Sequence, residues 1–341
     1  MQMEWKGGFS EMIASTRVRL ARNVKGMRYG ALTQKEKQTI ADQVWEALQT
    51  APSVGRDMRR IEVTPGTVAG AALTEQHLIS RELYQNGGYV ILSQDRHVSI
   101  MIGEEDHIRL QVMGTGFCPK ECLDTAKKIE KLISERVAFE YNQRLGYLTS
   151  CPTNLGTGLR ISVMMHLWML TACGEMENII SAASRGGYAV RGAGGEGTAA
   201  EGGFYQLSNQ ITMGLTEEAI EEKLQKTAMS ILEREKKLRI KMLSSGNYDI
   251  RDRLMRSVGA VMTAYQMESG ESEKRLSDVL LALQQGYIRG VTPEQIYQLM
   301  QDVRPASLME HDARAEMPKE RDRLRAEKIR TELGRSIQLA E

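Results

Sequence analysis

The chain has little of what marks nucleic-acid-binding, secreted or membrane proteins. Aromatic residues make up only 5% of its 341 residues, and 45 lysines and arginines balance 44 aspartates and glutamates. Nucleic-acid binders rely on aromatic stacking and a basic field, so the composition argues against nucleic acid as a direct partner. No apolar run reaches the ~18 residues of a membrane span, and the first residues are too polar for a signal sequence. We therefore expect a cytoplasmic protein without a membrane contact.

Cysteines are also few. The sequence has them at Cys118, Cys122, Cys151 and Cys173. The first two form a lone C-x-x-x-C without a second pair at the spacing of a zinc site, so no protein-held metal is predicted. This cysteine usage fits a reduced cytoplasmic enzyme, and the length allows two domains.

Familiar nucleotide-binding motifs are missing as well. The sequence contains neither the G-x-x-x-x-G-K-[ST] of P-loop enzymes nor the HRD and DFG motifs of protein kinases. A G-x-G-x-x-G does occur, at Gly192, Gly194 and Gly197, but a strand-like Phe204–Leu207 follows where a dinucleotide site needs a helix. We reject the dinucleotide interpretation and interpret this glycine-rich segment, which holds Glu196, as a lid over a reacting centre.

The hydrophobic pattern divides the chain into a part with strands and a part without. Alternation and short apolar runs predict strands over Ser15–Arg22, Tyr89–Ser93, Val98–Ile102, Ile108–Met113, Tyr188–Arg191 and Phe204–Leu207. Helical periodicity predicts helices over Thr33–Gln49, Thr74–Tyr84, Cys122–Asn142, Glu177–Ala183 and Thr216–Met242. After a break at Ser244–Asn247, helices are predicted over Ile250–Met267, Glu273–Gln284, Pro293–Val303 and Lys319–Leu333. We predict a sheet-and-helix domain over 1–243 and an all-helical domain over 248–341.

Two charged segments allow both a structural and a functional interpretation. Alternation places Arg17 and Arg19 on one face of a strand, where they either form the solvated face of an edge strand or bind phosphate through their planar donors. Three carboxylates stand together in Glu104-Glu105-Asp106-His107, followed by Arg109. Such a run is either an ordinary acidic turn or a catalytic one that needs cations nearby.

A third segment runs from Cys151 to Arg160, with the sequence Cys-Pro-Thr-Asn-Leu-Gly-Thr-Gly-Leu-Arg. Its proline and asparagine favour a turn, and its glycines permit close approach to another group. On composition alone this is a loop more often than a site. It nevertheless combines a thiol and a fixed cation within one turn-rich stretch.

Taken together and in order, these segments resemble the active site of the guanidino (phosphagen) kinases. The matching segments are Ser15–Arg19, Glu104–Arg109, Cys151–Arg160 and Arg191–Glu196. The resemblance implies an α+β fold, with an antiparallel sheet flanked by helices in the catalytic domain. It also implies transfer of phosphate from ATP, bound with Mg²⁺, to a guanidinium nitrogen.

The resemblance assigns roles to individual residues. It implies that ATP is bound by Arg17, Arg19, Arg109, Arg160 and Arg191. Glu105 and Glu196 would hold the acceptor guanidinium and remove its proton, and the Cys151 thiolate would hydrogen-bond it. The metal would enter with ATP rather than be bound by the protein.

Two departures point to one branch of this family. The small-molecule members carry a helical domain before the Ser15–Arg19 segment and lack the helical tail, so this chain is more similar to the bacterial protein-arginine kinases. This implies phosphorylation of protein arginines in the stress response, marking proteins for a Clp protease and inactivating a heat-shock repressor. An activator protein and a homodimer are further implied partners. Gly103 departs from the family, which usually has Asn there.

The tail holds Arg321-Asp322-Arg323-Leu324-Arg325-Ala326. By itself this is a solvated, charged helix. In the protein-arginine kinases an R-D-x-x-R-A motif receives phosphoarginine and regulates activity allosterically, which implies that role for Arg321, Asp322, Arg325 and Ala326.

Two alternatives remain. The chain could be a small-molecule guanidino kinase of the arginine type, or a non-catalytic regulator that binds phosphoarginine. The second is disfavoured, because a protein without catalysis has little reason to keep Glu105, Glu196 and the phosphate-binding arginines.

Overall fold

The computed structural model describes residues 10–30, 32–192, 201–244 and 248–340. Within these residues an antiparallel sheet of eight strands has the order β2-β3-β4-β5-β1-β8-β10-β9. The strands are β1 (Ile13–Arg22), β2 (Met58–Val63), β3 (Gly88–Ser93), β4 (Val98–Ile102), β5 (Ile108–Thr115), β8 (Leu159–His166), β9 (Tyr188–Gly192) and β10 (Phe204–Asn209). A separate hairpin is formed by β6 (Tyr141–Asn142) and β7 (Gly146–Tyr147). The predicted α+β class is confirmed.

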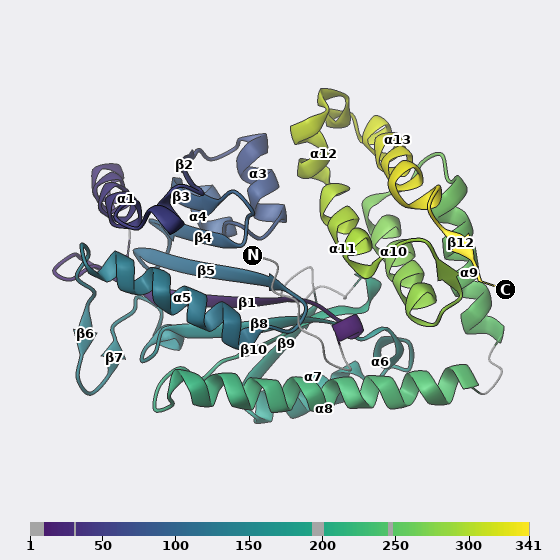
Figure 1. The fold of residues 1–341 in the computed structure, drawn as a ribbon, viewed down its shortest axis with the longest axis horizontal. Helices are drawn as coiled ribbons and strands as arrows, with labels where there is room; N and C mark the ends of the chain where they lie inside the picture. Colours follow the sequence, from purple (N-terminus) through teal and green to yellow (C-terminus); the bar gives the residue numbers. More distant parts are fainter. Residues whose placement is uncertain (1–9, 31, 193–200, 245–247, 341) are drawn as a thin grey trace.

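The two faces of the sheet differ in chemistry because side chains alternate along each strand. On β1, Val18 and Leu20 are fully buried in the main core, whereas Arg17 and Arg19 point to the opposite face. The apolar face is covered by α1 (Gln34–Gln49), α5 (Pro119–Ser134) and α8 (Glu217–Ser244), of which α8 runs along the length of the sheet (Figure 1). The sheet therefore has one apolar face and one cationic face.

The first strand lies in the middle of the sheet, paired with β5 on one side and β8 on the other. The edge-strand interpretation of Arg17 and Arg19 is therefore wrong. Their arginine-bearing face lies among neighbouring strands, which can add further side chains to it.

Local signals set several helix ends. Thr33 and Glu36 form the predicted capping box of α1. The helix predicted over Thr74–Tyr84 is wrong, because α3 (Val68–Glu75) ends before His77, which has a positive φ of 59°, and Ser80 caps a new helix, α4 (Arg81–Asn86). The long helix predicted over Cys122–Asn142 begins earlier, with Pro119 in its first turn, and ends at Ser134. The remaining helices before α8 are α2 (Pro52–Gly55), α6 (Trp168–Ala172) and α7 (Met176–Arg185).

The C-terminal region is helical apart from a two-residue ladder between β11 (Ile288–Arg289) and β12 (Gln338–Leu339). Its helices are α9 (Tyr248–Thr263), α10 (Ser269–Gln284), α11 (Pro293–Asp302), α12 (Pro305–His311) and α13 (Pro318–Ile329). Thr292, Pro293 and Gln295 form the predicted start of α11, whereas α12 was not predicted. None of the helices in the described residues is long and apolar enough to span a membrane.

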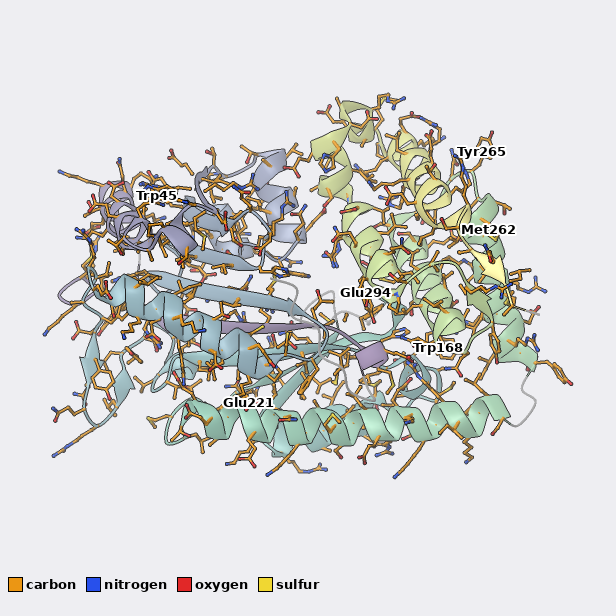
Figure 2. The ribbon with its side chains drawn as sticks, in the orientation of Figure 1. Trp45, Trp168, Glu221, Met262, Tyr265 and Glu294 are labelled. Atoms are coloured by element: carbon orange, nitrogen blue, oxygen red, sulfur yellow. The ribbon has the colours of Figure 1, made fainter. Side chains whose placement is uncertain are left out.

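The C-terminal helices share a core with the sheet domain. Their hydrophobic cluster includes Trp168 and Phe204, and the indole of Trp168 donates to Asp278 of α10 at 2.7 Å, at the base of these helices (Figure 2). Residues 245–247, where the junction was predicted, lie outside the described part of the chain. The division into 1–243 and 248–341 stays a prediction.

Candidate active site

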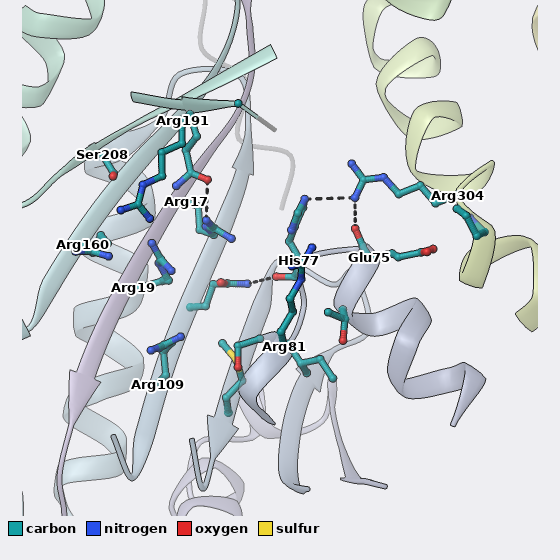
Figure 3. Close-up of a pocket in the computed structure, with 18 of the residues that line it drawn as sticks. Arg17, Arg19, Glu75, His77, Arg81, Arg109, Arg160, Arg191, Ser208 and Arg304 are labelled. Carbon is teal, nitrogen blue, oxygen red and sulfur yellow. Dashed lines mark hydrogen bonds between the residues drawn. The ribbon is translucent and has the colours of Figure 1, made fainter. Parts of the chain in front are cut away.

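The arginines predicted to bind ATP come together on the polar face of the sheet (Figure 3). Arg19 pairs directly across β1 and β8 with Arg160, and Arg109 stands opposite Ala21 on the neighbouring strand β5. Arg191 of β9 reaches the same place from beyond β10. Pairing across antiparallel strands thus brings together residues that are distant in sequence. All five arginines line one cavity of about 590 Å³.

These cations are crowded, and all but the exposed Arg191 are half-buried. The Nε atoms of Arg19 and Arg160 are buried without a hydrogen-bond partner among the described residues. Burial, and after it repulsion from Arg109 and Arg160, lowers the pKa of Arg17 to about 10. The pKa values of Arg19 and Arg160 are lowered for the same two reasons, burial first. A site that crowds several half-buried cations and leaves buried donor atoms without described partners favours a polyanion.

A polar neighbour orients part of this cluster. Arg17 donates through Nη2 to Oε1 of Gln206 at 3.0 Å, and Gln206 stands opposite Arg191 on β10. Gln206 therefore fixes the direction of one guanidinium without neutralising its charge. It was not predicted, because a strand glutamine has no sequence pattern of its own.

The two glutamates of the acidic turn after β4 have different surroundings. Glu104 is buried and forms an ion pair with Arg109 at 2.5 Å. Glu105 is half-buried and, together with Cys151, opposes the lowering of the Arg160 pKa, which places both groups within electrostatic reach of that arginine. Glu104 is thus held by an arginine of the cluster, whereas Glu105 and Cys151 act on Arg160 electrostatically and are not among the residues that line the cavity.

Asp106 and His107 act as a structural support. Asp106 is fully buried and accepts hydrogen bonds from the Ser150 amide at 2.6 Å, from Asn23 at 3.1 Å and from Asn154 at 3.0 Å. His107 accepts through Nδ1 from the Val24 amide. This network joins the acidic turn to the loop that carries Cys151. Asn23 was missed from the sequence, because its function depends on two distant loops.

The thiol of Cys151 is half-buried and lies 3.0 Å from Oγ1 of Thr153. The glycines of its loop allow the backbone to pack against itself rather than against a ligand. A Cβ on Gly156 would lie 2.5 Å from the Thr212 carbonyl oxygen, and one on Gly158 would lie 2.6 Å from that of Ala21. The close approach expected of these glycines is therefore internal to the fold.

His77, in the turn between α3 and α4, also lines the cavity and was missed by sequence reasoning. Burial, and after it repulsion from Arg304 and Arg17, lowers its pKa to about 3. The imidazole is therefore neutral at ordinary pH. No pattern in the sequence indicates its role, because this turn was predicted to be helical.

The far wall of the cavity belongs to the C-terminal region. Arg304, just before α12, donates to the Glu75 carbonyl and lies 3.4 Å from Nε2 of His77 (Figure 3). The Glu75 carboxylate accepts from the Ala306 and Ser307 amides at 2.8 and 3.1 Å. A double contact thus fixes α12 against α3 at the mouth of the arginine cavity.

The structure leaves the predicted second carboxylate untested. Glu196, with Gly194 and Gly197, lies outside the described residues, so its role stays a prediction. Among the described residues, no group of three or more His, Cys, Asp or Glu side chains is placed to hold a metal ion.

The predicted regulatory motif lies on α13. Arg325 is 1% exposed and donates to the Val303 and Met267 carbonyls at 2.9 and 2.8 Å and to Asp322. Arg321 donates to the Ala315 carbonyl at 3.2 Å, and its Nε is buried without a partner among the described residues. Ala326 is buried beside them. The motif is thus partly a structural element, and its binding role stays a prediction.

Two family models match the chain. ATP:guanido phosphotransferase, C-terminal catalytic domain, matches residues 39–238, and the C-terminal domain of protein-arginine kinase McsB matches residues 247–340. The chain therefore belongs to the ATP:guanido phosphotransferase family.

Curated relatives narrow this to one branch. The protein-arginine kinase of Bacillus subtilis (strain 168) is 38% identical over 337 residues, which cover 97% of this chain and 92% of that protein. The protein-arginine kinase of Caldanaerobacter subterraneus subsp. tengcongensis is 37% identical over 332 residues, 95% of this chain and 98% of that protein. The chain is thus a kinase of the protein-arginine kinase branch.

Solved structures share the fold. The duplicated taurocyamine kinase of Schistosoma mansoni aligns with a TM-score of 0.59 and 24% identity, covering 79% of this chain and 40% of that one. Lombricine kinase aligns with a TM-score of 0.57 and 25% identity, covering 72% and 69%. The phosphagen-kinase-like fold is confirmed.

Proposed function

We propose that the protein phosphorylates arginine side chains of proteins at the expense of ATP. The observation that carries this proposal is the group of sheet arginines around one cavity. Among the described residues, the Nε atoms of Arg19 and Arg160 have no hydrogen-bond partner, and Glu105 and Cys151 lie within electrostatic reach of Arg160. The family and the near full-length relatives support the same reaction.

The arginines bind and orient the donor. Phosphoryl transfer gains most of its acceleration from positioning and from neutralising charge on the phosphate oxygens, and fixed guanidinium groups supply both. ATP would supply phosphate oxygens as ligands for Mg²⁺.

The acceptor is the harder partner to activate. A guanidinium has a pKa above ~12 and is a poor nucleophile while protonated. Glu105 accepts a proton from the attacking nitrogen as the N–P bond forms and the P–O bond to ADP breaks. Glu196 is assigned the second carboxylate role by resemblance, and the Cys151 sulfur hydrogen-bonds the guanidinium. Products are phosphoarginine, ADP and one proton.

The cellular setting follows from the branch. The proposal includes action in the cytoplasm, in the stress response and protein quality control, with substrates marked for a Clp protease and a heat-shock repressor inactivated. It also includes an activator protein, a homodimer, and phosphoarginine binding at Arg321, Asp322, Arg325 and Ala326. The names of the relatives and the match to the C-terminal domain support this branch.

The test is to incubate the chain with ATP, Mg²⁺ and a casein-like protein, or with free arginine, and to detect phosphoarginine by mass spectrometry. We expect transfer to protein, its loss in Glu105→Gln, and normal transfer in the control Glu135→Gln, which changes an exposed residue that follows α5. Acid-labile phosphate on free arginine alone would contradict the proposal and favour the small-molecule kinase. Phosphoarginine binding without any transfer would favour the regulator.

A further inference from the structure

Gly103, which departs from the family pattern, has a structural counterpart in Lys37. Gly103 follows β4 with a φ of 88°, and its amide donates to the His107 carbonyl at 3.0 Å, which closes the acidic turn. A Cβ on Gly103 would lie 2.6 Å from Cδ of Lys37 and 2.8 Å from its Cγ and Cε. Asparagine tolerates a positive φ, so the backbone conformation alone does not require glycine here. The space taken by the Lys37 side chain does.

Lys37 of α1 is buried, with only 7% of its surface exposed. Its ammonium group donates to the Gly87 carbonyl at 2.6 Å and to the Asn86 carbonyl at 3.3 Å. These carbonyls lie at the end of α4, where acceptors without an intrahelical partner favour a cation. The aliphatic stem of Lys37 is thus held at both ends, by α1 and by the end of α4, and it passes over Gly103 between them.

The turn that carries Glu105 is fixed on both sides of that residue. Glu104 is held by an ion pair, and Asp106 accepts three hydrogen bonds. Before the turn, β4 lies so close to the start of β3 that a Cβ on Gly88 would be 2.4 Å from the Ile102 carbonyl oxygen. The Glu105 carboxylate itself has no hydrogen bond to another described residue. Its position therefore depends on the backbone of the turn.

We propose that Lys37 is a positioning residue for phosphoryl transfer. Its stem, packed on Gly103, fixes the start of the acidic turn, so that Glu105 meets the acceptor guanidinium in the geometry that proton removal needs. A reacting group displaced by about 1 Å can cost up to 10²-fold in rate. Lys37 does not line the arginine cavity, so it acts through the turn. This inference rests on the proposed function in taking Glu105 as the proton acceptor.

The test measures kcat for transfer to a casein-like protein and the Kd of ADP, both with the full chain. Gly103→Asn can keep the positive φ but forces the Lys37 stem aside. We expect kcat to fall about tenfold, while the Kd of ADP, which depends on the sheet arginines, changes by less than about twofold. Gly66→Asn is the matched control, because Gly66 also has a positive φ, of 78°, and a Cβ there would meet no described group within 4 Å. Its kcat should equal that of the unchanged chain.

A double variant separates a local role from a general loss of stability. Lys37→Ala should lower kcat about threefold, because the turn loses its support. Adding Gly103→Asn to Lys37→Ala should lower kcat no further, because the shortened side chain leaves room for the asparagine. Urea unfolding of each variant checks that the folded state is populated in the assay.

Equal kcat values for Gly103→Asn and Gly66→Asn would overturn the proposal. So would losses that multiply in the double variant, because Lys37 and Gly103 would then act independently. Weakening of ADP binding in proportion to kcat would also overturn it, since the effect would lie on the arginines or on folding. Failure of the proposed function would look different: the unchanged chain would transfer no phosphate to protein, and the positioning role would fall with it.

Discussion

Two sets of arginines, one on the sheet and one on α13, show that withdrawal from water can serve either a site or the fold. On the sheet, Arg19 and Arg160 are crowded by other cations and keep Nε atoms without partners among the described residues. On α13, Arg325 is more deeply buried, but it donates to two carbonyls and a carboxylate. Burial of a cation is therefore not a mark of function, whereas unmet hydrogen-bonding capacity among like charges is.

The largest effect should come from the sheet. Arg160→Ala is expected to lower the phosphoryl-transfer rate about a thousandfold, because one fixed cation is lost where phosphate charge develops. The free energy of unfolding should not fall, since repulsion from Arg191 and Arg109 disappears with it. Rate assays and urea unfolding check the two halves. A strongly destabilised variant would show that this arginine belongs with Arg325 instead.

The reverse pattern is expected on α13. Arg325→Ala leaves the Val303 and Met267 carbonyls and Asp322 without their partner, so the free energy of unfolding should fall by about 3 kcal/mol. Urea unfolding measures this change, with the exposed Arg256→Ala as the matched control. If Arg325→Ala proved as stable as the control, the contrast drawn between the two sets would fail.

Stability should depend on pH through His77, which lies beside the sheet arginines. Because the pKa of folded His77 is about 3 and its ordinary value is 6.5, the folded protein binds fewer protons between these values. The contribution of His77 to stability is thus complete above pH 6.5 and is lost as the pH falls toward 3. His77→Gln should flatten this part of a plot of urea midpoint against pH. An identical dependence of the urea midpoint on pH in the variant would show that His77 does not contribute to it.

The smallest structural effect is expected at Arg321. Its one described backbone acceptor is Ala315, so Arg321→Ala should change the free energy of unfolding by less than about 1 kcal/mol. Binding of free phosphoarginine should nevertheless weaken measurably in calorimetry if its unpartnered Nε belongs to the regulatory site. Equal binding by the variant and the unchanged chain would separate Arg321 from that site.

Sequence reasoning found the parts of the site that local pattern controls. Alternation placed Arg17 and Arg19 on one face, and a capping box located the start of α1. It missed His77, because a positive φ in a short turn is not visible in apolar periodicity. It also missed Asn23, which acts only when distant loops meet.

The C-terminal side of the arginine cavity was not predicted from the sequence either. No pattern near Arg304 in the sequence indicates that it contacts Glu75, which is 229 positions earlier in the chain. Such contacts depend on how whole elements pack, and pattern within one segment carries no information about that packing.

The double contact between Glu75 and the start of α12 has a consequence for turnover. Arg304 and Glu273 line the arginine cavity from the C-terminal side, so a movement of α12 away from α3 would open one wall of that cavity. A nucleotide bound to the sheet arginines would then leave most readily when this wall opens. A partner that binds the C-terminal helices would therefore change the rate of nucleotide exchange.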